Sequence, residues 1–97
     1  MASVLRSATP DLRAIMDQAG VSRADQYRFY YDGFNTVGVF SQMGDSRTDT
    51  RGAVYNYLSL DPNNIRERPR VAKVVDAWET SVKRSEIQRE KDAQWHK

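Results

Sequence analysis

The chain has 97 residues, of which 39% are hydrophobic and 29% charged, and its formal net charge is +2. This length supports one domain with one modest core. The absence of cysteine excludes disulfides and thiolate chemistry, and no apolar run approaches the ~18 residues of a membrane span. The first residues lack the apolar centre of a secretory signal, so we expect a virion or an intracellular, reducing location.

Residues 1–8 show no hydrophobic periodicity and are predicted to form an N-terminal arm. Thr9 suits the N-cap of a first helix, and Pro10 suits its first position. Gly20 suits the left-handed position that ends a helix. Between these signals, apolar residues recur at the spacing of one buried helix face: Leu12, Ile15, Met16 and Ala19.

A second helix is predicted from Ser22, which forms a variant of the capping box with Asp25, to about residue 31 or 32, before Gly33. This stretch carries four aromatic side chains: Tyr27, Phe29, Tyr30 and Tyr31. One helix face cannot bury them all, so we expect two to pack and two to meet solvent or a partner. Tyr30 and Tyr31 are the candidate partner-binding residues.

Two further short helices are expected before the long C-terminal one. Asn35 or Thr36 can cap a third helix, which carries Val37, Phe40 and Met43 and ends at Gly44. The polar segment 45–51 is a loop in which Asp45 is a fair N-cap, and a fourth helix is predicted over about residues 48–58. A strand over Ala53–Leu60 is the alternative, because this stretch is rich in β-favouring residues.

The longest helix is predicted from Pro69 to about Ala93, with a buried stripe over its first half: Val71, Val74, Val75, Trp78 and Val82. After this stripe the helix is almost entirely polar and carries mixed charges at helical spacings. We therefore predict an all-α fold, in which four short helices and one long C-terminal helix form a compact bundle over residues 9–83. Residues 84–97 form a projecting polar helical tail.

Four short helices followed by a long one resemble the SAM-domain-like class of folds. The segment GFNTVGVF at residues 33–40 also resembles a turn of helix-hairpin-helix modules, including the RNA polymerase alpha C-terminal domain. The segment AGVS at 19–22 resembles the hairpin turn of that group, with Ser22 where a second glycine is usual. Similar turns occur in small helical proteins of viruses and of mobile elements in marine protists. Because members of this class bind proteins, DNA or RNA, the resemblance does not decide the function.

No residue set predicts catalysis, a cofactor or a metal. Gly33 and Gly38 have P-loop spacing, but Val39 and Phe40 stand where a P-loop carries Lys and Ser or Thr. The loop aspartates lack EF-hand spacing and a closing glutamate. His96, the one histidine, has no cysteine or serine partner in the pattern. We therefore expect a protein that is not an enzyme and binds no small-molecule substrate.

Basic residues concentrate in the second part of the chain. The segment 66–73 carries four cations in eight residues: Arg66, Arg68, Arg70 and Lys73. They could contact phosphates or an acidic protein groove, or form a solvated face with Glu67 and Asp76 as local partners. Cations are unfavourable at a helix N-terminus, which favours an external partner slightly.

In the tail, Arg84, Ile87 and Trp95 are candidate contact residues, because Ile87 and Trp95 lie off the buried stripe. We expect a non-enzymatic structural or adaptor subunit that binds protein partners in a multi-subunit assembly. A small capsid-associated protein (minor capsid or cement) of a virus or phage is the most concrete form. The alternative is a nucleic-acid-binding accessory protein that uses the segment 66–73 together with tail cations: Lys83, Arg84 and Arg89.

Overall fold

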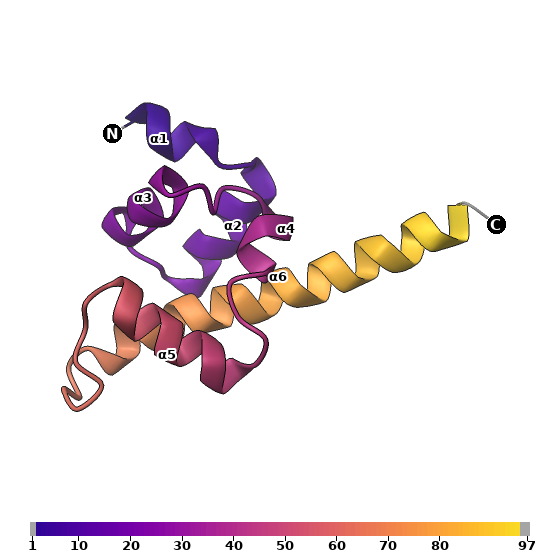
Figure 1. Ribbon diagram of the computed structural model, residues 1–97. Helices are drawn as coiled ribbons and strands as arrows, with labels where there is room; N and C mark the ends of the chain where they lie inside the picture. Colours follow the sequence, from indigo (N-terminus) through magenta and orange to yellow (C-terminus); the bar gives the residue numbers. More distant parts are fainter. Residues whose placement is uncertain (1, 96–97) are drawn as a thin grey trace.

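Six helices make up the computed structural model, which describes residues 2–95 (Figure 1). They are α1 (Ala2–Ser7), α2 (Pro10–Ala19), α3 (Arg23–Tyr31), α4 (Val37–Ser41), α5 (Arg47–Tyr57) and α6 (Arg68–Trp95). The described residues contain no strand, so the all-α prediction is confirmed. The ambiguous stretch after Ala53 continues α5 as a helix to Tyr57.

The helix ends follow local signals in the sequence. Gly20 has a φ of 85° and ends α2, and the Val21 N–H donates to the Met16 carbonyl oxygen at 3.0 Å. The hydroxyls of Ser22 and Thr36 accept hydrogen bonds from backbone N–H groups and begin α3 and α4. The N-cap of α5 is Ser46 in place of the expected Asp45.

The first residues fold differently from the prediction. Residues 2–7 form the helix α1, which packs on α3, whereas the sequence predicted an N-terminal arm over residues 1–8. Val4 and Leu5 pack against the core, and Ala8 is buried. A helix of this length is less than two turns long, so the periodicity of its apolar residues does not appear in the sequence.

The first half of α6 packs against α2, α4 and α5 and contributes one side of the hydrophobic core. Its predicted stripe is buried at Val71, Val74, Val75 and Trp78, and Val82 at its end is half-buried. The Trp78 indole N–H donates to the Ser41 carbonyl oxygen at 3.2 Å and links α6 to the end of α4. Each fully buried apolar side chain of this kind contributes about 1.5–3 kcal/mol to folding.

The second half of α6 leaves the globule as a single helix, as the sequence predicted (Figure 1). All described side chains from Lys83 to Gln94 are exposed, except that Ser85 is half-buried beside α4. The stripe of apolar residues ends at Val82, so no face of the later turns has a core to pack on.

Candidate binding surfaces

The basic segment at the start of α6 lies against the turn between α2 and α3. A cavity of about 270 Å³ lies between the two stretches, and residues of both line it: Gly20, Val21, Ser22, Asp25, Arg66, Pro69, Arg70 and Lys73. The methylene groups of Lys73 lie about 3.5 Å from the position of a Cβ built on Gly20. The structure therefore places the hairpin-like turn and the basic segment, which are about 45 residues apart, at one surface.

Arg70 forms an ion pair with a buried carboxylate of α3. Its Nε and terminal NH2 group donate to the two carboxylate oxygens of Asp25 at 2.9 and 2.6 Å, and Asp25 is only 2% exposed. The hydrogen bond to Asp25 raises the pKa of Arg70. The Arg70 guanidinium therefore neutralises a buried carboxylate and is not a free cation of the segment, while its predicted contact with a partner stays a prediction. The expected local partner Asp76 pairs with Arg47 of α5.

The structure splits the remaining cations of the segment between two places. Arg66 and Lys73 line the cavity at the α2–α3 turn, whereas Arg68 lines a separate hollow with Arg51 of α5. Arg66, Arg68 and Lys73 are exposed and make no ion pair within residues 2–95. Two uncompensated charges thus remain at the turn, where they can bind an anionic group.

Tyr30 and Tyr31 point to opposite environments. Tyr30 is buried, and its hydroxyl donates to the Gln26 side-chain oxygen at 3.0 Å, so it is wrong as a partner-binding residue. Burial raises the pKa of Tyr30 well above its ordinary value. Tyr31 is 69% exposed and stacks on Tyr27 with ring centroids 6.0 Å apart, so it remains a candidate contact residue.

The tail carries one exposed apolar residue among polar ones. Ile87 is 53% exposed, and Arg84 is exposed on the same half of α6. The side chain of Trp95, and the whole of His96, lie outside the described residues. Of the predicted tail contacts, Ile87 and Arg84 are therefore placed on a freely accessible helix.

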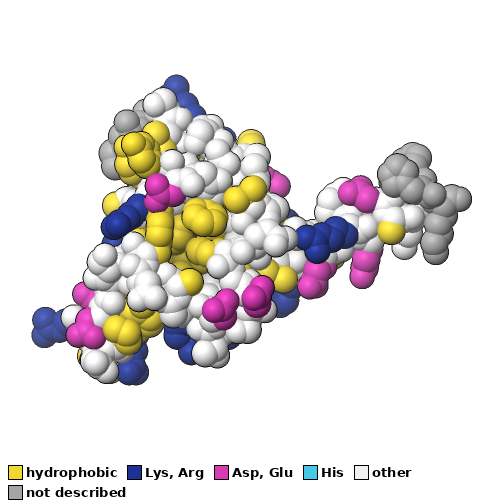
Figure 2. All heavy atoms as spheres, in the orientation of Figure 1, with side chains coloured by type: hydrophobic (Ala, Val, Ile, Leu, Met, Phe, Trp, Pro, Cys, Tyr) yellow, Lys and Arg dark blue, Asp and Glu magenta, His cyan; other side chains and the backbone are white. Residues whose placement is uncertain are grey.

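Sequence reasoning missed two apolar surface residues and an aromatic cluster. Ile65 in the loop before α6 and Val39 in α4 are 71% and 45% exposed. Hydrophobic side chains also gather in the middle of one face, between α3 and α5 (Figure 2). The half-buried Phe34 and Tyr57 rings pack edge to face with centroids 6.3 Å apart, and both also pack on the Phe29 ring. Single apolar residues in a loop or in a five-residue helix carry no periodic signal that would reveal their exposure.

The described residues contain no cluster of side chains suited to hold a metal ion. Within residues 2–95, no three acidic or histidine side chains converge as metal ligands. None of the helices in this range is both long enough and apolar enough to cross a membrane. No family model, curated protein or solved structure matches the chain.

Proposed function

We propose that this protein is a non-enzymatic structural or adaptor subunit that binds neighbouring protein chains in a larger assembly. A small capsid-associated protein, of the minor capsid or cement type, is the most concrete form of the proposal. The observation that carries it is the second half of α6, a helix that leaves the globule with nearly every described side chain exposed.

The physics of short helices supports this reading. The projecting part spans about a dozen residues, and isolated helices of that length are marginal in water. Because the projecting part continues α6, the buried first half of α6 already provides the nucleating turns of the helix. A partner that packs against the projecting part therefore meets a helix that is already formed. Ile87 supplies an exposed apolar side chain on the tail, and Tyr31 supplies another on the globule.

The proposal is tested by following the tagged full-length chain by sedimentation in extracts of its own cells. We expect the full chain to travel with a larger complex, and the Ile87→Asn variant or a chain lacking residues 84–97 to sediment alone. The Gln88→Asn variant, which changes the adjacent exposed position, is the control and should stay in the complex. A full chain that sediments alone, or a truncated chain that stays fully incorporated, would contradict the proposal.

The basic cavity at the α2–α3 turn favours a second candidate function, which is nucleic-acid binding. Arg66 and Lys73 are exposed, uncompensated within the described residues and placed beside a helix-turn-helix corner. Two such cations can neutralise two phosphates of a nucleic-acid backbone. Lys83, Arg84 and Arg89 on the projecting helix could extend the contact along the strand, since all three are exposed.

Salt dependence separates the two functions. If nucleic acid is bound, the affinity for a labelled oligonucleotide falls steeply with salt, and Arg66→Gln/Lys73→Gln lowers the slope of log K against log[salt] by roughly 1.5–2. The control is Arg51→Gln, which removes an exposed charge on α5 and should leave the slope within about 0.3 of the wild type. Equal slopes for the double variant and the wild type would exclude the cavity as the phosphate-binding surface.

A further inference from the structure

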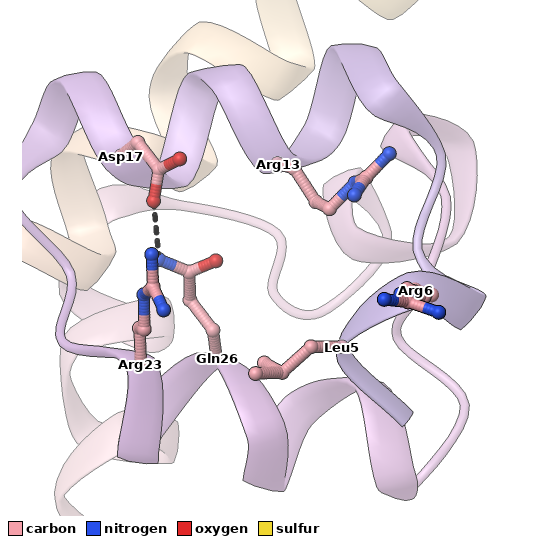
Figure 3. Close-up of a pocket in the computed structure, with 6 residues that line it drawn as sticks. All are labelled: Leu5, Arg6, Arg13, Asp17, Arg23 and Gln26. Atoms are coloured by element: carbon pink, nitrogen blue, oxygen red, sulfur yellow. Dashed lines mark hydrogen bonds between the residues drawn. The ribbon is translucent and has the colours of Figure 1, made fainter. Parts of the chain in front are cut away.

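A second cavity lies where α1, α2 and α3 meet, separate from the one at the start of α6. Its volume is about 300 Å³, and six residues line it: Leu5, Arg6, Arg13, Asp17, Arg23 and Gln26. Cavities that hold small molecules begin at about this size. Figure 3 shows the guanidinium groups of Arg6 and Arg13 toward one side of it, and Arg23 beside Asp17 and Gln26 on the other.

The charges around this cavity do not cancel. Three arginines from three elements and one carboxylate line it, and none of the three arginines makes an ion pair within residues 2–95. That carboxylate, of Asp17, already accepts a hydrogen bond from the Gln26 amide at 2.9 Å. Gln26 is in turn fixed, because the same amide nitrogen donates to the Val21 carbonyl oxygen and its oxygen accepts from Tyr30. The Asp17 carboxylate is thus held by the Gln26 side chain, which is itself fixed by two further hydrogen bonds.

Arg13, which lines the cavity, carries one unpaired donor. The Nε of Arg13 is buried and has no hydrogen-bond partner among the described residues. A buried donor on a charged group is costly to leave unpaired, and such atoms in native proteins call for a water, an ion or a ligand. An oxyanion in the cavity would accept from the guanidinium nitrogens that line it and offset the positive charge of the three arginines.

We propose that this cavity binds a small oxyanionic molecule, one that carries phosphate or carboxylate groups. Arginine is suited to both groups, because its planar fork of donors matches their pairs of oxygens. The bound group would also bridge Arg6 of α1 to Arg13 and Arg23 of the main globule. Binding would therefore hold α1 in place, in addition to the contacts that Val4 and Leu5 already make.

The test uses the full-length chain and NMR titration of backbone amides with two probes, pyrophosphate and citrate, against sodium chloride at matched ionic strength. We expect saturable shifts at the amides of Leu5, Arg13 and Gln26 with at least one probe. The probe that binds more tightly identifies the phosphate or the carboxylate class. Hydrogen exchange of the α1 amides should slow in the presence of that probe and not in sodium chloride.

Variants at the two exposed arginines make the test specific. Arg6→Gln/Arg23→Gln should weaken binding at least about a hundredfold, because it removes two charged hydrogen bonds and each is worth about tenfold or more. Both side chains are exposed, so the variant should keep the wild-type fold, as checked by its far-UV circular dichroism. Arg89→Gln on the tail is the matched control and should bind like the wild type. Absence of saturable shifts with both probes, or equal binding by the double variant, would overturn the proposal.

Discussion

The ion pair between Asp25 and Arg70 should be a principal support of the fold, and its two sides should respond unequally to mutation. Arg70→Ala leaves a carboxylate that is 2% exposed without its two guanidinium hydrogen bonds. Breaking a buried pair in this way costs about 3–5 kcal/mol. The Arg70 side chain is 47% exposed, and water therefore screens part of the interaction. We expect a loss of about 2–3 kcal/mol in the free energy of unfolding.

Replacement of the other partner, Asp25, should reduce the free energy of unfolding by less. Asp25→Asn keeps the shape of the buried side chain and frees Arg70, whose half-exposed guanidinium can turn to water, so we expect a loss of about 1–2 kcal/mol. Urea unfolding monitored by the fluorescence of the buried Trp78 measures both values. By the usual scaling for a domain of this size, Arg70→Ala should lower Tm by about 10–20 °C.

Two comparisons would refute this reasoning. Arg66→Ala removes an exposed arginine of the same segment and should change stability by no more than about 0.5 kcal/mol. If Arg70→Ala costs no more than this control, the pair does not stabilise the fold. If Asp25→Asn costs more than Arg70→Ala, the argument from the buried carboxylate is wrong.

Three further predictions rest on packing, burial and the tail. Gly44→Ala should destabilise the fold by about 1–3 kcal/mol in urea unfolding, because the new Cβ would lie 2.2 Å from the Thr50 hydroxyl oxygen. Gly52→Ala, in open space within α5, should instead stabilise it by about 0.5–1 kcal/mol, and the same sign for both would contradict this account. Burial raises the pKa of Tyr30, so the unfolded chain loses that proton first, and stability should fall as the pH rises above about 10. Tyr30→Phe should show a smaller alkaline loss in urea midpoints, and an identical pH profile would refute the assignment. A chain lacking residues 84–97 should unfold with a free energy within about 1 kcal/mol of the full chain, since the deleted side chains are almost all exposed where described; a larger loss in urea unfolding would mean that the tail packs on the globule.

Local signals in the sequence predicted much of the fold. The stripe from Val71 to Trp78 has strict helical spacing, and it lies in the core as expected. Gly20 and Gly33 both have positive φ and follow the ends of α2 and α3, because each position requires a conformation that glycine adopts without strain. The helix α1 was missed, because its few residues carry too little periodic signal.

The candidate surfaces were harder to predict, because they depend on contacts between distant residues. Asp25 was interpreted as part of a cap, and nothing local indicates that its carboxylate meets Arg70, 45 positions later. Tyr30 and Tyr31 are adjacent, and the aromatic run around them does not show which of the two faces inward. The cavity at the α1–α2–α3 junction is lined by arginines that are scattered in the sequence, so no local pattern indicates it.

The continuity of α6 fixes a distance between two surfaces. Lys73 at the turn and Ile87 on the tail are 14 positions apart on one helix, which corresponds to about 21 Å and nearly four turns. Groups bound at Lys73 and at Ile87 would therefore lie a fixed distance apart and on nearly the same side of α6. Insertion of two residues after Val82 would therefore rotate Ile87 by about 200° around the helix axis relative to Lys73, without changing the buried part of α6.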